Sequence, residues 1–187
     1  MAKAEPIIGL NPQAPTRDNA LLIARAKIVE FYSWNEYVDH PYAIRELHNM
    51  RISAKRLRYT LEIFEDVLPP ACKSAREEMV RIQEELGLLH DSDVMIALLR
   101  LCLASQEETI NEQALQEKQK KQAKSFLPPN LLPILLDTDL APSAEQRYGL
   151  EQFLRRSEQE RYQVFRQHWQ HLKGQHFRQR LWTILDA

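Results

Sequence analysis

A run of basic side chains between residues 45 and 58 is the part of this sequence best suited to chemistry. The run contains His48, one acid and five cations: Arg45, Arg51, Lys55, Arg56 and Arg58. On a helix with about 100° per residue, His48, Arg51, Lys55 and Arg58 fall within one arc of roughly 100°. Each turn of this face offers another donor, so the pattern suits a polyanion that runs along the helix. Arginine would supply planar pairs of donors and lysine a point charge.

The apolar residues around this run form a second arc, centred roughly 110° to 130° away from the first. They are Leu47, Met50, Ala54, Leu57, Leu61 and Phe64. The two arcs predict one amphipathic helix from about Tyr42 to Val67, ended by the prolines at 69 and 70. A solvated helix whose cations only keep the protein soluble is the simpler interpretation of the basic arc.

Two motifs resemble a known family. The pattern H-x-x-R-x-x-x-K-R-L-R-Y-x-L-E-x-F, from His48 to Phe64, is similar to the signature of the CHAD family, the conserved-histidine α-helical domain. The segment L-G-L-L-H-D-S-D-V, residues 86–94, resembles the L-G-x-x-x-D-x-D-V motif of that family, with His90 where arginine or asparagine is commoner. The resemblance is strongest over residues 44–103 and looser on either side.

The resemblance implies an all-α protein, an antiparallel bundle of four to six helices. It also implies non-catalytic binding of inorganic polyphosphate, or a similar polyanion, through the basic helix. Carried over residue by residue, the binding side chains are His48, Arg51, Lys55 and Arg58, with Arg56 on the flank. Further candidates are Arg45, Arg25 and Lys27. We expect no cofactor, no metal and no catalytic residue.

Typical members of the family carry two such halves, whereas this chain resembles one intact half. The segment 147–153 weakly echoes 58–64, but Asp137, Leu140 and Ala144 stand where the first half has His48, Arg51 and Lys55. A groove lined from two halves would therefore need two copies of this chain. A homodimer is the arrangement that would supply them.

Composition agrees with a helical protein of one domain, which we place at residues 17–187. The chain has 187 residues, 44% of them hydrophobic and 27% charged, with only four glycines. Because the net charge is only −1, any affinity for anions must come from a local cluster of basic residues.

Cys72 and Cys102 make neither a disulfide framework nor a metal-ligand spacing, which is typical of a reducing compartment. No apolar stretch reaches the roughly 18 residues of a membrane span, and the first residues, Met-Ala-Lys-Ala-Glu-Pro, lack the apolar core expected of a signal peptide. These features predict a cytoplasmic protein, and the family's ligand suggests an association with polyphosphate granules.

Prolines and capping residues predict the other elements. The first elements are an extended lead-in over residues 1–16 and a helix from Thr16 or Asp18 to about Tyr37. After the basic helix come a helix from Cys72 to Leu89, a polar break at Asp91 or Ser92, and a helix from Val94 to about Lys124. The last elements are a proline-rich loop over residues 126–143, a long helix that begins after Ser143, and a short segment from Phe177 to Leu185 after Gly174.

Some residues near the motifs have simpler structural interpretations. Gly87, Asp91 and Asp93 are expected to shape a close helix junction, where the aspartates would also form salt bridges with the basic side chains. Glu62 follows Arg58 by four residues and is expected to orient it. Tyr59 is expected to be a packing residue.

Two metal-based interpretations rest on histidine and aspartate content alone. The pair His90-Asp91, with His48 and either Asp137 or Asp139, resembles the content of helical metal-dependent phosphohydrolases, although such a centre needs those side chains to converge. The second interpretation uses the C-terminal histidines at 168, 171 and 176 as metal ligands. Only the first two share a helical face, and no carboxylate stands at a suitable sequence spacing.

Two binding functions compete with polyphosphate. Nucleic acid is another phosphate chain, but the basic arc lacks exposed aromatic residues for base stacking, and the sequence pI of 6.6 also argues against it. A helical scaffold for protein–protein interaction is the main alternative. Its interface would be the Gln-rich helix predicted from Val94 to about Lys124.

Overall fold

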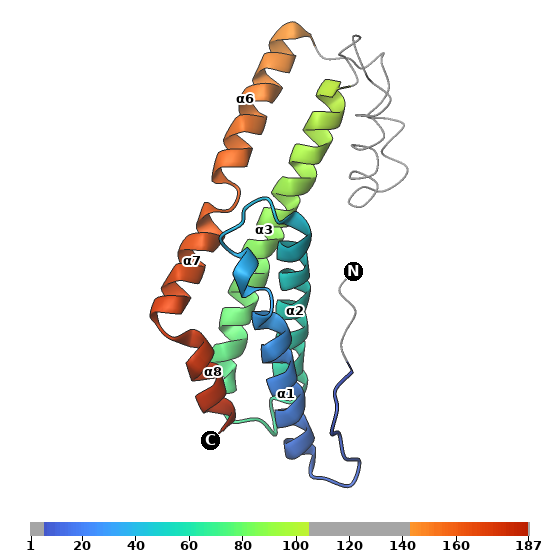
Figure 1. The fold of residues 1–187 in the computed structure, drawn as a ribbon, viewed down its shortest axis with the longest axis vertical. Helices are drawn as coiled ribbons and strands as arrows, with labels where there is room; N and C mark the ends of the chain where they lie inside the picture. The colour runs from blue at the N-terminus through green and yellow to red at the C-terminus, as the bar shows by residue number, and fades with distance from the viewer. Residues whose placement is uncertain (1–5, 105–142, 187) are drawn as a thin grey trace. The chain divides into compact units, whose positions relative to one another are not determined.

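The structure, a computed structural model, describes residues 6–104 and 143–186, and all regular structure in these ranges is helical (Figure 1). This confirms the predicted all-α class. The elements in chain order are α1 (Thr16–Tyr32), the 3₁₀ helix η1 (Asn35–Tyr37), α2 (Ile44–Ile63), α3 (Cys72–Ala104), α6 (Ala144–Glu160), α7 (Gln163–Gly174) and α8 (Phe177–Leu185). The chain divides into two compact units, one made of Met1–Leu88 and Tyr162–Ala187, the other of Leu89–Arg161. The prediction of a single domain over 17–187 stays a prediction.

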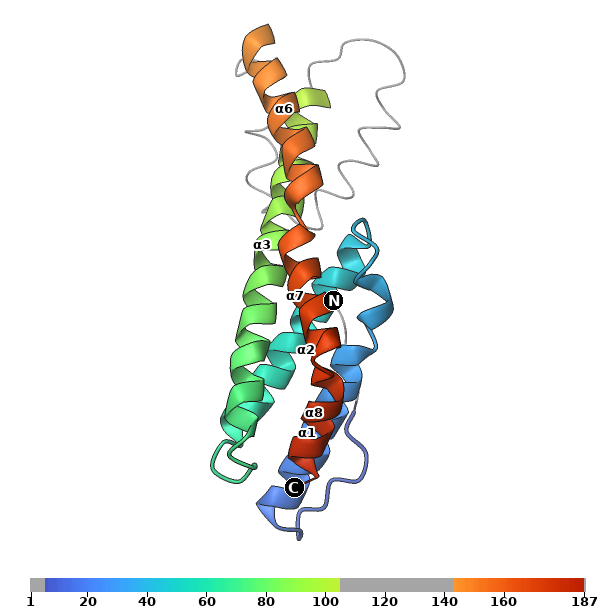
Figure 2. The same ribbon diagram turned by 90° about the vertical axis from the view of Figure 1, so that its left-hand side faces the viewer.

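The first unit is built on α1 and α2, which run antiparallel and side by side in both ribbon views (Figure 2). The predicted apolar arc of α2 lies in its core: five of its six residues are buried, and Phe64, just past the helix end, is half-buried. The same core contains Ile28 and Phe31 of α1, Met79 and Ile82 of α3, and Phe165 and Trp169 of α7. The helical periodicity of the apolar residues therefore predicted the buried face of α2 correctly.

The ends of the first helices differ from the predictions. The N-cap of α1 is Pro15, without a side-chain hydrogen bond, so neither Thr16 nor Asp18 caps this helix. A separate 3₁₀ turn, η1, replaces the last predicted turns of α1. Helix α2 ends at Ile63, four residues before the predicted end.

The predicted break at Asp91 or Ser92 is wrong, because α3 runs through it as one helix of 33 residues. This range has no proline and a single glycine, so nothing in it interrupts the helix. Within the second unit, the buried carboxylate of Asp93 forms a salt bridge with Arg161. The helix predicted beyond residue 104 and the proline-rich loop up to residue 142 lie outside the described residues.

The predicted start of the last helix after Ser143 is confirmed. The Ser143 Oγ accepts a hydrogen bond from the Gln146 backbone N–H at 3.3 Å, and the Gln146 side chain accepts one from the Ser143 N–H at 2.8 Å. The single long helix is not observed, because α6 ends at Glu160 and α7 begins at Gln163. Helix α7 then ends at Gly174 and α8 spans Phe177–Leu185, as predicted.

Helix α7 is held in the first unit by aromatic packing and by one histidine. The Trp169 ring packs edge-on against Phe31, with ring centroids 5.6 Å apart. The His168 ring lies between two carboxylates of α3, with Nδ1 2.7 Å from Glu85 Oε2 and Nε2 3.2 Å from Glu78 Oε2. These two contacts fasten α7 to α3. No helix in the described ranges is long and apolar enough to cross a membrane.

The half-buried Glu85 gives a pH-dependent prediction. Burial raises the pKa of its carboxyl above the ordinary value, against the opposing hydrogen bond and charge of His168. The ionised Glu85 therefore lowers the free energy of unfolding at neutral pH. This destabilisation disappears as the pH falls through the raised folded-state pKa and the carboxyl takes up a proton. We expect the melting temperature of the wild type, relative to Glu85→Gln, to rise as the pH is lowered from neutral through the raised folded-state pKa of Glu85. The exposed neighbour Glu84→Gln is the control, and a constant difference for Glu85→Gln would contradict the prediction.

Candidate functional site

Helix α2 presents its basic residues on two different sides of the helix. Arg51, Lys55 and Arg58 lie on the face that includes α3 and solvent, with the half-buried His48 one turn before Arg51. Arg56 lies toward α1, where it meets Glu30. The structure thus brings the four residues of the predicted arc together on one face and separates Arg56 from them. We call Arg51, Lys55 and Arg58 the basic face of α2.

Gly87 of α3 lies beside the first of these cations. A Cβ atom placed on Gly87 would lie 3.6 Å from Arg51 Nε, an ordinary van der Waals distance, so the guanidinium lies against α3 at this point. The neighbour of Gly87 is thus the Arg51 side chain, and the close helix junction expected here stays a prediction. The Arg51 Nε atom is buried and has no hydrogen-bond partner among the described residues.

Tyr59 organises the other two cations. Its ring has the Arg58 Cζ atom 4.5 Å from the centroid and the Lys55 Nζ atom 5.5 Å away, distances at which a cation is attracted to an aromatic face. With 42% of its surface exposed, Tyr59 is more than a packing residue, and the prediction that the basic arc lacks an exposed aromatic residue is wrong. The four-residue spacing of Lys55 and Tyr59 was the sequence signal for this contact.

The carboxylates near the motifs do not neutralise this face. In the part of the chain that the structure describes, Glu62 forms no ion pair with Arg58, contrary to expectation, and Asp91 forms none at all. Asp93 pairs with Arg161 rather than with a cation of α2. Across residues 6–104 and 143–186, none of Arg51, Lys55 and Arg58 takes part in an ion pair.

Three other predicted cations already have carboxylate partners. Glu30 of α1 accepts from Lys27 at 2.7 Å through Oε2 and from Arg56 through Oε1. Arg25 donates to Asp186 Oδ1 at 2.8 Å and to the Leu185 carbonyl at 3.1 Å. These contacts use the positive charges to join α1 to α2 and α1 to the end of α8.

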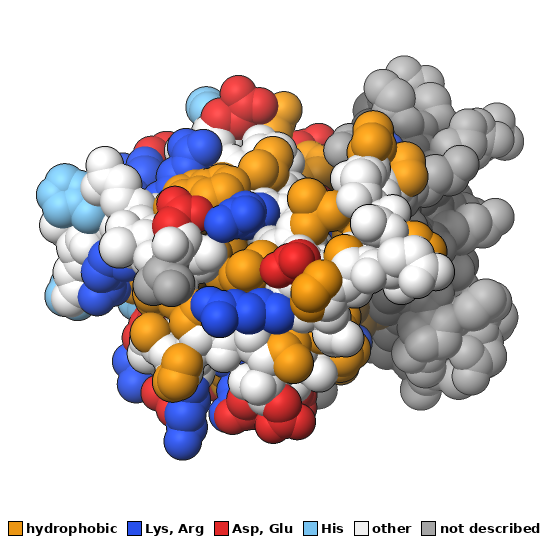
Figure 3. Space-filling view, turned by 90° about the horizontal axis from the view of Figure 1, so that it is seen from below, with side chains coloured by type: hydrophobic (Ala, Val, Ile, Leu, Met, Phe, Trp, Pro, Cys, Tyr) orange, Lys and Arg blue, Asp and Glu red, His pale blue; other side chains and the backbone are white. Residues whose placement is uncertain are grey.

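Arg45, the remaining candidate, is exposed in the first turn of α2. At the end of the molecule drawn in Figure 3, basic, acidic and hydrophobic side chains are interspersed. Local positive charge of the kind seen on α2 is therefore a property of particular helix faces and not of the whole surface, in agreement with the net charge of −1.

The histidines considered as metal ligands are engaged differently. His168 faces Glu78 and Glu85, the His171 Nε2 atom lies 2.7 Å from the Gln175 side chain, and His176 is exposed between α7 and α8. Within the described residues, no group of three or more histidine, cysteine, aspartate or glutamate side chains could hold a metal ion. Asp137 and Asp139, which the phosphohydrolase interpretation needs, lie outside these residues.

Comparison with known families places this site in a wider context. The family model of the CHAD domain matches residues 12–100. The resemblance to the CHAD family is confirmed. The match begins earlier than the region of strongest resemblance, and it includes α1, α2 and most of α3. The basic face of α2 and the other candidate cations, Arg25, Lys27, Arg45 and Arg56, therefore lie in the CHAD segment, whereas Arg161, α6, α7 and α8 lie outside it. No curated protein and no solved structure matches the chain.

The partners of Glu30 give a stability prediction. The Glu30→Gln variant leaves Lys27, with 9% of its surface exposed, and Arg56 beside a neutral group. Breaking a largely buried ion pair by removing one charge is costly, so we expect a loss of about 2–3 kcal/mol in the free energy of unfolding, measured with urea. The control is Asp186→Asn, which removes the exposed ion pair with Arg25 and should cost less than about 1 kcal/mol. Equal losses in the two variants would contradict the structural role of Glu30.

Proposed function

We propose that this protein binds inorganic polyphosphate, or a similar polyanion, on the basic face of α2, and that it does so without catalysis. The observation that carries the proposal is the contrast between two sets of cations. Lys27, Arg56 and Arg25 each meet a carboxylate, whereas the three cations of the basic face form no ion pair in the described part of the chain. A set of neighbouring cations without internal anions is suited to an external one.

The spacing of the basic face favours an extended ligand. At about 1.5 Å per residue, Arg51 and Arg58 are about 10 Å apart along the helix axis, with Lys55 between them. A phosphate chain carries a charge on every unit, so it can meet all three side chains in succession and release bound counterions. A single small anion would reach only one or two of them.

The surroundings of the two guanidinium groups orient them before a ligand arrives. The Arg51 side chain lies against α3 at Gly87, and the Arg58 guanidinium lies over the Tyr59 ring. Their Nε atoms are buried without a hydrogen-bond partner among the described residues, so a phosphate would accept from the Nη atoms. Side chains that are already oriented lose less entropy on binding.

The CHAD resemblance points to the same ligand class. It implies polyphosphate binding through the signature helix, and residues 12–100 include that helix with His48 and every cation of the basic face. We assign Arg51, Lys55 and Arg58 as the main contacts, with His48 beside them. Arg45 would extend the face at its N-terminal end. Arg56, Lys27 and Arg25 support the helices that carry it.

The direct test is a titration with long-chain polyphosphate near 0.15 M salt, with single-stranded DNA and ATP in parallel. We expect Arg51→Gln/Arg58→Gln to weaken polyphosphate binding by roughly a hundredfold, because each charge-assisted hydrogen bond contributes about 1.5–3 kcal/mol. The slope of log affinity against log salt should fall in magnitude by about 1.4, from two lost phosphate contacts. The control Lys73→Gln/Arg155→Gln removes the same charge from two exposed positions and should bind as the wild type does.

Three results would overturn the proposal. They are a wild-type protein that does not bind polyphosphate, an Arg51→Gln/Arg58→Gln variant that binds normally, and equal affinity for DNA and polyphosphate. The last would indicate a general anion surface. The first would favour the scaffold function, which pull-down experiments would then examine. Circular dichroism of each variant checks that helicity is native.

The proposal has two further parts. One intact CHAD-like half would be completed by a second copy, so we propose a homodimer, and a monomeric mass in light scattering would count against it. We also propose that the protein is cytoplasmic and accompanies polyphosphate granules. Fluorescence microscopy of a tagged chain in cells that form such granules would test that location.

A further inference from the structure

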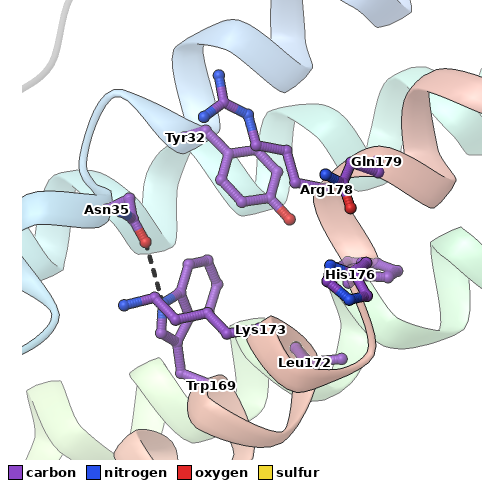
Figure 4. Close-up of a pocket in the computed structure, with 9 residues that line it drawn as sticks. Tyr32, Asn35, Trp169, Leu172, Lys173, His176, Arg178 and Gln179 are labelled. Atoms are coloured by element: carbon purple, nitrogen blue, oxygen red, sulfur yellow. Dashed lines mark hydrogen bonds between the residues drawn. The ribbon is translucent and has the colours of Figure 1, made fainter.

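A hollow of about 240 Å³ lies where the end of α1 and η1 meet α7 and α8, all in the first unit (Figure 4). Its apolar lining is formed by Trp169, Leu172 and Phe177, which are each less than 5% exposed, together with the ring of Tyr32. The hollow shares no lining residue with α2. It is therefore a different site from the basic face.

The rim of the hollow is basic. Lys173, His176 and Arg178 line it from α7, α8 and the connection between them, and no acidic side chain lines it. The carboxylate closest to this rim in the described contacts belongs to Asp39. Its Oδ2 is 3.9 Å from Lys173 Nζ, and its Oδ1 accepts from Arg166 at 3.1 Å. Lys173 is thus only loosely compensated.

Neutral donors complete the lining. The Asn35 Oδ1 atom accepts from the Trp169 indole at 3.1 Å, the bond drawn as a dashed line in Figure 4. This leaves the NH₂ of Asn35 to contact a ligand. Burial raises the pKa of the Tyr32 phenol, against the opposing charges of Arg178 and Arg180, so the phenol keeps its proton and can donate. The Arg178 guanidinium lies 5.2 Å from the centroid of the same ring.

We propose that this hollow binds a small organic anion, a carboxylate or phosphate monoester attached to a compact apolar body. Lys173 and Arg178 favour a negative group over a neutral one. The rings and aliphatic carbons that line the hollow would contact the apolar part of such a ligand. The volume is below the range of about 300–1,000 Å³ that is usual for drug-sized ligands, so the body is no larger than about one ring.

The test uses phenyl phosphate and benzoate as probes, with inorganic phosphate and the neutral benzamide as comparisons. The readout is the indole N–H signal of Trp169 in heteronuclear NMR, identified among the three tryptophans with Trp169→Phe. We expect both organic anions to shift this signal at millimolar concentration. Inorganic phosphate and benzamide should each bind at least about tenfold more weakly than phenyl phosphate and benzoate.

Variants separate this site from the surface charges and from the basic face. The change Lys173→Gln/Arg178→Gln should weaken both organic anions at least about tenfold. The charge-matched control Lys73→Gln/Arg155→Gln should leave their affinity unchanged, and so should Arg51→Gln/Arg58→Gln. If the first variant does not fold, Arg178→Gln alone takes its place, and Arg178→Lys should retain most of the binding because it keeps the charge.

The proposal is overturned if neither probe shifts the Trp169 signal up to about 10 mM. It is also overturned if Lys173→Gln/Arg178→Gln binds both anions as tightly as the wild type does, because the probes would then bind at another site. Equal affinity for inorganic phosphate and phenyl phosphate would exclude a role of the apolar lining and so the organic ligand. These outcomes do not depend on whether α2 binds polyphosphate.

Discussion

The packing of the first unit depends on where α2 places its side chains. Its apolar arc faces the core, and basic residues lie on both sides of this arc. Because the arc is buried, the basic residues that flank it must lie at the borders of the core. On one border, Glu30 forms ion pairs with Lys27 and Arg56, and the pair with Arg56 links α1 to α2. On the other border, no carboxylate of residues 6–104 and 143–186 pairs with a cation of the basic face. The position of one acid on α1 therefore decides which cations are structural and which stay available to a ligand.

The available cations are held by neutral groups. The Arg51 side chain lies against α3 at Gly87, and the Tyr59 ring attracts Lys55 and Arg58 without cancelling their charge. An acid in either place would orient the same side chains but would compete with an external anion. This arrangement orients the cations and preserves their positive potential. The hollow at α7 and α8 likewise has Lys173 and Arg178 beside an apolar lining.

Local features could be predicted from the sequence because they depend on residues within one or two helical turns. The buried arc of α2, the capping box at Ser143 and Gln146, and the helix end at Gly174 follow from periodicity and side-chain chemistry. The shared face of His48 and the three cations is also a matter of spacing. The prediction of a cap at Asp91 failed because α3 contains no proline, and its single glycine does not interrupt the helix.

Which charged groups meet was decided only by the tertiary structure. Glu30 and Arg56 are 26 residues apart, and Glu85 and His168 are 83 apart. Helical periodicity gives the face on which such a residue lies, but not the helix that packs against that face. The contact of Arg51 with Gly87 and the hollow under Arg178 arise in the same way, from helices that are distant in sequence. The sequence by itself determined the helices and the cationic face of α2, whereas helix packing determined which of the cations are left for a ligand.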